Sequence, residues 1–185
     1  MSGQIGNNIL RASGVVATDV AGVGTARAWM AAVRYGSSGQ SLFAYGQNSG
    51  GYHSMRNLVS NTGVVASDVS GAGTARAQIS AASYGEDNAI FAYGTTGSSV
   101  SMSNLVSNSG VVASDTSGVG TARHGPGATG YGGDKAIFAY GYSTASSSYL
   151  SVSNLVNSSG VIASDVTGVG TARFELGAAG YSSSA

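Results

Sequence analysis

The chain has no cysteine, one proline among 185 residues, and few charges. Without cysteine it forms neither disulfides nor thiolate metal sites. Only 9% of its residues are charged, the net charge is zero, and the eight lysines and arginines are spread along the chain. Proteins that bind nucleic acid need a basic patch to neutralise phosphates. We therefore expect no nucleic-acid partner.

Long hydrophobic runs are also missing. No apolar stretch approaches the 18 or so residues that a membrane-spanning helix needs, so we expect no membrane partner. The first six residues lack the basic and apolar regions of a cleavable signal peptide. Thirty glycines could indicate disorder, but 42% of the residues are hydrophobic and Tyr and Phe recur along the chain. This composition predicts a folded core.

The chain does contain a phrase that occurs four times with small variations, Gly-Val-Val-Ala-Ser-Asp-x-x-Gly-x-Gly-Thr-Ala-Arg. Its copies begin at Gly14, Gly63, Gly110 and Gly160, at spacings of 49, 47 and 50 residues. An Asn-Leu-Val phrase precedes each copy, at Asn57, Asn104, Asn154 and, in the drifted form Asn-Ile-Leu, at Asn8. A third phrase, Phe-Ala-Tyr-Gly, occurs at 43–46, 91–94 and 138–141. A period of 20–50 residues indicates one stacked supersecondary unit, and we interpret 1–185 as a single repeat domain.

Each repeat reads as a set of short strands. In the unit 76–115, β-branched, aromatic and alternating residues predict strands at 79–84, 89–94, 100–106 and 111–114, with polar turns between them. Glycines interrupt every candidate helix. Four short strands in about 47 residues are typical of a β-propeller blade, so we predict an all-β propeller. A β-solenoid is the alternative.

The order of these pieces resembles the kelch repeat family. Thr-Ala-Arg (25–27, 74–76, 121–123 and 171–173) is similar to the turn that leads into a kelch blade, and Phe-Ala-Tyr-Gly is similar to its aromatic strand. The chain departs from the pattern in ending this strand with one glycine and in lacking the marker tryptophan. The phrases also resemble uncharacterised tandem-repeat proteins of bacteriophages and aquatic microbial communities. That resemblance implies a component of a virion or an extracellular surface, and this is the localisation we expect.

The repeats do not close into whole units at the chain ends. Three full blades are predicted at 27–68, 76–115 and 123–165. The remaining segments, 8–19 and 173–181, supply a composite fourth blade that lacks its aromatic strand. An open sheet edge is a template for pairing with another strand. We therefore expect a homo-oligomer through the terminal strands, with closure within one chain as the alternative.

One aspartate and one arginine, eight residues apart, recur in every repeat, and we predict that they fix the turn between blades. They are Asp19, Asp68, Asp115 and Asp165 with Arg27, Arg76, Arg123 and Arg173. A ring of carboxylates around a cation is the alternative, but calcium takes six to eight oxygens and each loop offers one carboxylate. A dinucleotide loop needs a helix after its glycines, whereas a strand is predicted here. We expect no metal and no cofactor.

The aromatic residues fall into two groups. Those in repeated positions, such as Tyr45, Tyr93 and Tyr140, are predicted to pack one blade against the next. Those in unrepeated positions are the candidate contacts with a partner or a glycan, because loops on a rigid scaffold commonly carry recognition. With one of the two histidines they are Trp29, Tyr52, His53, Tyr142 and Tyr149. We place Tyr52, Tyr142 and Tyr149 in the loops that follow the aromatic strands.

No motif in the sequence matches a catalytic mechanism, because Gly-x-Ser-x-Gly is absent and no ligands are patterned around His53 or His124. We therefore expect a non-enzymatic structural or interaction protein. It would self-assemble or decorate a larger particle, such as a phage virion or an extracellular filament, and could contact other virion or surface proteins. The alternative is an adhesin or lectin that binds carbohydrate through its variable loops.

Overall fold

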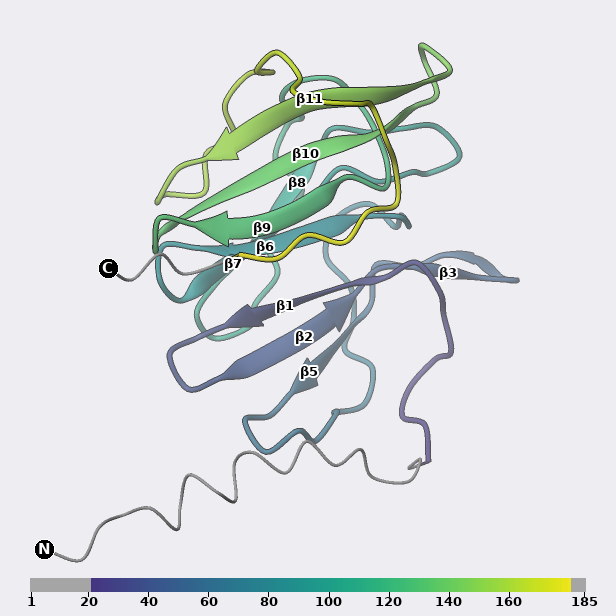
Figure 1. The fold of residues 1–185 in the computed structure, drawn as a ribbon. Helices are drawn as coiled ribbons and strands as arrows, with labels where there is room; N and C mark the ends of the chain where they lie inside the picture. The colour runs from purple at the N-terminus through teal and green to yellow at the C-terminus, as the bar shows by residue number, and fades with distance from the viewer. Residues whose placement is uncertain (1–20, 181–185) are drawn as a thin grey trace, which may run out of the picture.

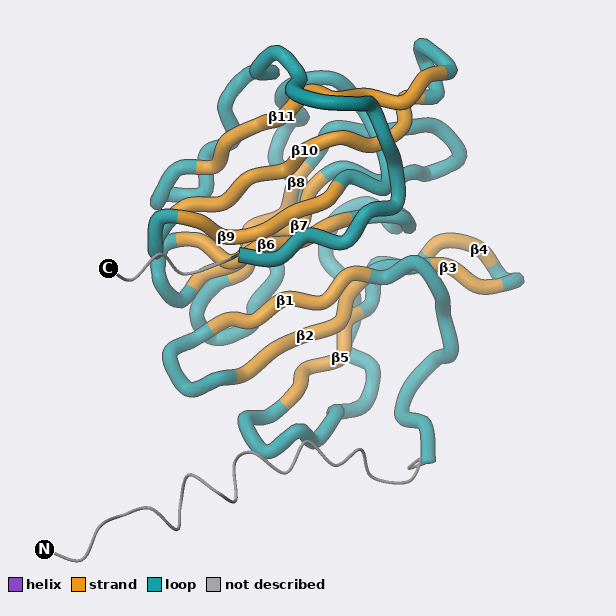
Figure 2. The backbone as a smooth tube through the Cα atoms, viewed as in Figure 1, coloured by secondary structure: helices purple, strands orange, loops and turns teal. Residues whose placement is uncertain are grey.

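The structure is a computed structural model that describes residues 21–180. The predicted terminal segment 8–19, with Asn8, Gly14 and Asp19, lies outside the described residues, as does Tyr181. Over the described range every regular element is a β-strand (Figures 1 and 2), and the expected all-β class is confirmed.

Three sheets have the same plan, with three antiparallel strands in sequence order. The first contains β1 (Ala31–Tyr35), β2 (Gln40–Ala44) and β5 (Arg56–Val59). The second contains β6 (Ser80–Tyr84), β7 (Asn88–Ala92) and β8 (Ser103–Val106), and the third β9 (Gly127–Tyr131), β10 (Lys135–Ser143) and β11 (Ser148–Val156). We call the corresponding segments 27–68, 76–115 and 123–165 units 1, 2 and 3.

The fourth strand of each unit is reduced to isolated bridges, which differs from our prediction of four-stranded sheets. In unit 2, Val112 pairs with Val106 and Thr116 pairs with Ser103, but the residues between them form no continuous ladder. The equivalent bridges in the other units are Val59–Val65 with Arg56–Val69, and Val156–Ile162 with Ser153–Val166. The side chain of Asn104, which is fully buried, donates to the carbonyl of Ala113 at 3.0 Å. A side chain therefore replaces part of the backbone ladder in this segment.

The segments that follow the aromatic strands also differ from the expected loops. In unit 1 a short hairpin forms from two strands of two residues each, β3 (Gln47–Asn48) and β4 (Gly51–Tyr52). In unit 3 the ladder between β10 and β11 continues past a bulge between Ala139 and Gly141, so that Tyr142 lies opposite Tyr149. Tyr52, Tyr142 and Tyr149 are therefore strand residues and not loop residues.

The first strands of the sheets lie next to one another, β1 beside β6 and β6 beside β9, and the sheets spread away from them (Figure 1). One apolar cluster fills the space between units 1 and 2, with Leu42 and Tyr45 against Phe91. A second fills the space between units 2 and 3, with Ile90 and Tyr93 against Phe138. Strand β7 contributes to both clusters, which explains why four of its five residues are buried.

The outer faces of units 1 and 3 expose side chains that the inner interfaces bury. Phe91 and Phe138 are completely buried, whereas Phe43, at the same position of unit 1, is 37% exposed. Tyr35 and Tyr84 cover Gly110 and Gly160 of the following unit and are nearly buried. Tyr131 is the equivalent residue in unit 3, and it is 39% exposed.

Candidate functional site

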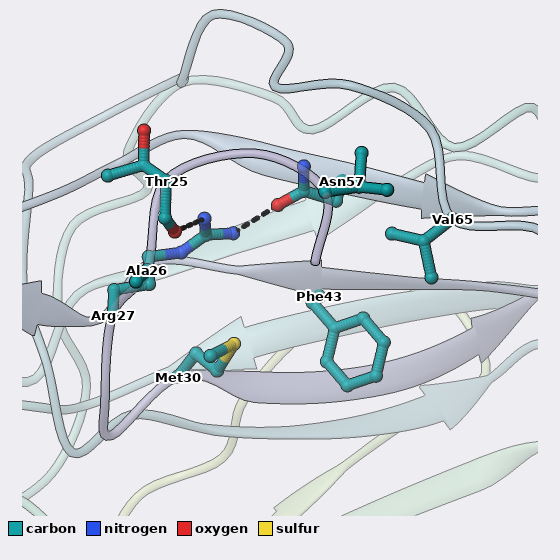
Figure 3. Close-up of a pocket in the computed structure, with 8 residues that line it drawn as sticks. Thr25, Ala26, Arg27, Met30, Phe43, Asn57 and Val65 are labelled. Carbon is teal, nitrogen blue, oxygen red and sulfur yellow. Dashed lines mark hydrogen bonds between the residues drawn. The ribbon is translucent and has the colours of Figure 1, made fainter. Parts of the chain in front are cut away.

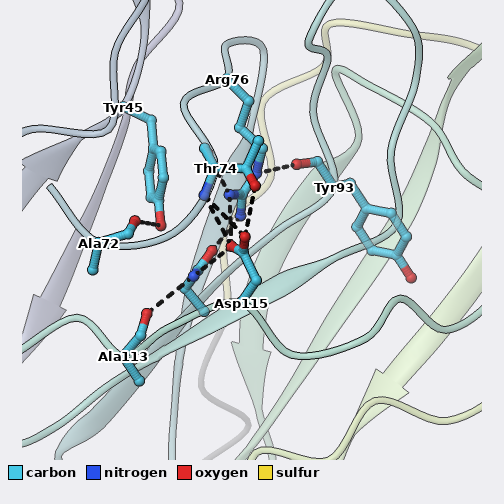
Figure 4. A network of polar contacts seen from close by, with 8 residues as sticks. Tyr45, Ala72, Thr74, Arg76, Tyr93, Ala113 and Asp115 are labelled. Carbon is cyan, nitrogen blue, oxygen red and sulfur yellow. Dashed lines mark hydrogen bonds and ion pairs between the residues drawn. The ribbon is translucent and has the colours of Figure 1, made fainter.

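The repeated aspartate closes each unit on itself through a group of bonds that we call the clasp. In unit 2 the carboxylate of Asp115 accepts hydrogen bonds from the backbone N–H of Thr74 at 2.9 Å and from its hydroxyl at 2.7 Å. The amide of Asn104 donates to the same carboxylate at 2.9 Å. The guanidinium of Arg76 lies 3.7 Å from Asp115, and its Nη2 donates to Asn104 Oδ1 at 2.6 Å (Figure 4). The clasp joins the start of the unit to its end.

The same clasp occurs in units 1 and 3 with nearly identical distances. Arginine Nη2 donates to the asparagine oxygen at 2.6 Å in unit 1 and 2.7 Å in unit 3. The arginine and aspartate are 3.6 and 4.0 Å apart. The residues are Thr25, Arg27, Asn57 and Asp68 in unit 1, and Thr121, Arg123, Asn154 and Asp165 in unit 3. The structure therefore brings six of the eight singled-out aspartates and arginines into clasps, pairing them within units.

The clasp keeps its carboxylates ionised. Hydrogen bonds from Thr25 and then Asn57 lower the pKa of Asp68. Burial by itself would raise the pKa of Asp115, but the bonds from Thr74 and Asn104 outweigh it and the pKa is lowered. The pKa of Asp165 is lowered in the same way by Thr121 and Asn154. Because these oxygens already accept bonds from the protein, they have little capacity left for a cation. Among residues 21–180 no group of three or more His, Asp or Glu side chains is arranged to hold a metal.

Three of the repeated arginines, Arg76, Arg123 and Arg173, also contact the aromatic strand of the preceding unit. The guanidinium of Arg76 lies over the ring of Tyr45, 4.4 Å from its centroid, and Arg173 lies over Tyr140 at the same distance. A cation over an aromatic face is attracted by the ring quadrupole, most strongly where water is excluded. Tyr45 also meets the edge of Phe91, with ring centroids 5.4 Å apart. Burial raises the pKa of Tyr45 to about 12, so this ring stays neutral at physiological pH.

One residue from each of the four repeats, two positions after the repeated arginine, lines a central hollow of about 300 Å³. Met30 and Leu176 also line it. The four equivalent residues are Trp29, Gln78, Gly125 and Glu175, all with left-handed backbone, at φ values of 54°, 49°, 58° and 54°. Their backbones form a chain of hydrogen bonds in which the N–H of each residue donates to the preceding carbonyl, at 2.9, 2.8 and 3.0 Å. Glu175, at the start of the fourth repeat, therefore borders the same hollow as Trp29, at the start of the first.

The hollow presents unrepeated side chains to solvent. Trp29 is 53% exposed, and Gln78 Nε2 donates to Glu175 Oε1 at 2.6 Å. A non-glycine residue in the left-handed region costs free energy, and such strain concentrates at functional sites. Sequence reasoning singled out Trp29 but missed Gln78 and Glu175. These positions could have been found in the sequence, because the second residue after the repeated arginine differs in every repeat.

A second group of unrepeated aromatics lies on unit 3, and we call it the aromatic cluster. Tyr142 contacts Tyr149 and His124, with ring centroids 5.5 and 5.4 Å apart, and Phe174 contacts all three. Burial lowers the pKa of His124, against an opposing effect of Glu175, which favours the neutral imidazole. Tyr149 is 57% exposed. Phe174 was missed by sequence reasoning, although it replaces the alanine found at 28 and 77.

The other candidate contacts are separate from these groups. Tyr52 pairs with Gln47 in the β3–β4 hairpin. His53 is partly buried next to it, and its Nε2 has no hydrogen-bond partner among the described residues. The five sequence-selected residues therefore divide among the hollow, the aromatic cluster and the hairpin of unit 1.

The outer face of unit 1 contains a further hollow of about 310 Å³ (Figure 3). Phe43, Met30 and Val65 form its apolar wall, and the clasp residues Arg27 and Asn57 lie at its other side. Val112 and Ile162, equivalent to Val65, are buried in the interfaces between units. Among the described residues no unit covers this hollow, whereas the equivalent faces of units 2 and 3 are buried against the preceding unit.

In comparisons with known proteins, the chain matches no family model and no curated protein sequence. Between residues 21 and 180 there is no helix that is long and apolar enough to span a membrane.

Proposed function

We propose that the chain is a non-enzymatic structural protein whose repeats are arranged as the blades of a kelch-like propeller around the central hollow, and which assembles with further copies of itself. The support for the radial arrangement is the hollow, because the starts of four successive repeats border it. The three clasped units form a rigid scaffold, and the exposed outer faces are the contact surfaces.

The observation that carries the assembly is the exposure of Phe43. The equivalent rings of Phe91 and Phe138 are completely buried against the tyrosine of the preceding aromatic strand. Among residues 21–180 there are three Phe-Ala-Tyr-Gly strands, and none of them covers Phe43 as Tyr45 and Tyr93 cover Phe91 and Phe138. A strand from a second copy can fill this place by edge addition. A homo-oligomer through the terminal unit results, suited to a virion or an extracellular filament.

The experiment is to measure the mass in solution by light scattering coupled to size exclusion, with negative-stain images of the peak. We expect a discrete multimer or a filament. Phe43→Ser should dissociate it, because the substitution places a hydroxyl in the contact. Val111→Ser is the matched control, since Val111 is 56% exposed and belongs to the middle unit. A wild-type chain that runs as an 18.1 kDa monomer at all concentrations would refute the proposed assembly.

A carbohydrate-binding role is the second candidate, and the central hollow favours it. An exposed indole beside an amide and a carboxylate offers a stacking surface and hydrogen-bonding groups for a sugar ring. Trp29 is the only tryptophan, so its fluorescence reports on this hollow directly. A glycan-array hit that shifts this fluorescence, and that Gln78→Ala weakens while Tyr149→Ala does not, would support binding at the hollow.

A further inference from the structure

The aromatic cluster occupies a place that units 1 and 2 build without aromatic rings. In each unit the residue after the repeated arginine forms a backbone bridge with the residue that follows Phe-Ala-Tyr-Gly. The bridges are Ala28 with Gln47, Ala77 with Thr95, and His124 with Tyr142. Since the first two bridges form with small or polar side chains, the fold does not require rings at this place. A binding role accounts for their presence in unit 3.

Backbone bonds fix Phe174 against the same strands. The segment that carries it crosses the ends of β10 and β11 (Figure 1). The N–H of Arg173 donates to the carbonyl of Leu150 at 3.3 Å, and the carbonyl of Arg173 accepts the N–H of Gly141 at 2.9 Å. The next residue, Phe174, is thereby held beside the aromatic residues of both strands.

Unit 2 holds the imidazole of His124 in place. The Oγ of Ser99 lies 2.9 Å from His124 Nδ1, and the same oxygen accepts the backbone N–H of Thr144 at 3.0 Å. Groups that are already ordered lose less conformational entropy when a ligand binds. The cluster is therefore a prearranged set of rings.

The rings of Tyr142, Tyr149 and Phe174 are close enough to act on one small ligand. Their centroids are 5.5, 6.1 and 6.0 Å apart, and their planes meet at 67°, 63° and 32°. A cation over a ring face is attracted within about 6 Å of the centroid. A small cation beside the cluster can therefore be in range of all three rings at once. Tyr149 is the most exposed of them and gives access from solvent.

The charges around the cluster favour a positive ligand. Glu175 is next in the chain to the cluster and is exposed. Its Oε1 accepts from Gln78 at 2.6 Å, and a carboxylate can accept further partners. Burial lowers the pKa of His124, against the opposing effect of Glu175, so the imidazole adds a ring and no positive charge at neutral pH. The guanidinium of Arg173 is engaged by Tyr140, to whose hydroxyl it donates at 2.9 Å.

We propose that the aromatic cluster, together with Glu175, binds the trimethylammonium group of an organic cation such as choline or trimethyllysine. The methyl groups pack on the rings, while the positive charge is attracted by the ring faces and by the carboxylate. An anionic ligand is repelled by Glu175, and a neutral one gains no charge attraction. The site depends neither on assembly nor on sugar binding at the central hollow, so each of the three stands or fails separately.

The first test compares choline with tert-butylethanol, in which a carbon atom replaces the charged nitrogen and the shape is kept. Proton NMR spectra of each ligand are recorded with the full chain, because methyl groups that lie over aromatic rings shift upfield. We expect choline to bind at least about fivefold more tightly than its neutral analogue. Equal binding of the two, or no binding of choline up to about 50 mM, would overturn the proposal.

The second test locates the site with variants of exposed tyrosines. Tyr149→Leu keeps an apolar side chain but removes the ring, and it should weaken choline binding at least about threefold. Tyr149→Phe keeps the ring face and should bind as the wild type does. Tyr131→Leu is the matched control, because Tyr131 is 39% exposed and lies outside the cluster. Choline that quenches the fluorescence of Trp29 equally in the wild type and in Tyr149→Leu would place the cation in the central hollow and overturn the assignment.

The part of Glu175 is tested separately. Glu175→Gln should weaken the binding of choline and leave that of tert-butylethanol unchanged, because only the first carries a charge. Phosphocholine should bind more weakly than choline, since its phosphate adds negative charge near the carboxylate. Tighter binding of phosphocholine would overturn the charge argument. A trimethyllysine peptide that binds as tightly as choline would support a protein as the source of the group, whereas binding of choline alone would support the free cation.

Discussion

The guanidinium of Arg123 lies 3.8 Å from the centre of the ring of Tyr93, so the clasp of unit 3 also covers the aromatic strand of unit 2. Tyr93 in turn meets the edge of Phe138, with centroids 5.5 Å apart. The same arginine closes its own unit through Asn154 and Asp165. The same side chain therefore closes its own unit and docks that unit on the preceding one, so the stability of neighbouring units should be coupled.

Replacing a clasp arginine with lysine should destabilise the whole chain. Arg76→Lys keeps the charge but loses the planar fork that reaches Asn104, Thr74 and the carbonyl of Tyr93. Leaving buried acceptors without partners costs about 1–3 kcal/mol each, so we expect a loss of about 2–4 kcal/mol in urea unfolding. Arg34→Lys is the control, because Arg34 is exposed, and it should change stability by less than about 0.5 kcal/mol. A similar loss in both variants would contradict this reading of the clasp.

Acid should destabilise the protein through its clasp carboxylates. The pKa values of Asp68, Asp115 and Asp165 are lowered in the folded state, relative to about 3.9 for an unfolded aspartate. Their contribution is therefore fully present above about pH 5 and is lost as the pH falls through the folded pKa. Melting temperatures measured from pH 6 downwards should be flat at first and then fall. The fall should be smaller in Asp115→Asn, and a flat profile to pH 2 would contradict the prediction.

Alkali should act through the buried tyrosines. Burial raises the pKa of Tyr45 and of Tyr93 to about 12, against about 10 in the unfolded chain. A group with a raised folded pKa contributes its full stability below the unfolded pKa, so this contribution is present up to about pH 10 and is lost between about pH 10 and 12. In a tyrosinate absorbance titration of the folded protein, Tyr45 and Tyr93 should be among the late-ionising tyrosines, together with Tyr35 and Tyr84, whose pKa values burial also raises. Tyr45→Phe and Tyr93→Phe should each remove one late step, and a single uniform titration would count against the burial.

The two apolar residues that follow Gly160 should differ sharply in their importance. Ile162 is 7% exposed and belongs to the core between units 2 and 3, whereas Val161 is 60% exposed. Ile162→Ala removes buried methyl groups and should cost about 2–5 kcal/mol in chemical unfolding. Val161→Ala should cost less than about 0.5 kcal/mol. Equal effects would mean that the segment 160–163 is oriented differently in solution.

The repeat was predictable from the sequence because equivalent residues make the same contacts in every unit. The strands expected at 79–84, 89–94 and 100–106 correspond to β6, β7 and β8 within a few residues. The strand expected at 111–114 is present only as isolated bridges, and the buried amide of Asn104 bonds the carbonyl of Ala113 where a ladder partner was expected. Local composition does not reveal such competition from a residue nine positions away.

The repeat unit, its β class and the recurrence of Asp and Arg could be predicted from the amino-acid sequence, because a periodic identity of residues needs no knowledge of the fold. The partners of Asp115 depend on the folded chain: it binds Thr74 and Arg76, 41 and 39 positions earlier, and not the nearby Thr121 and Arg123. The tertiary structure also decided that Trp29, Gln78 and Glu175 share one hollow, and that Phe43 is exposed while Phe91 is buried. The physical reason is that burial and pairing depend on which unit lies alongside, and identical phrases acquire different surroundings at the ends of an array and in its middle.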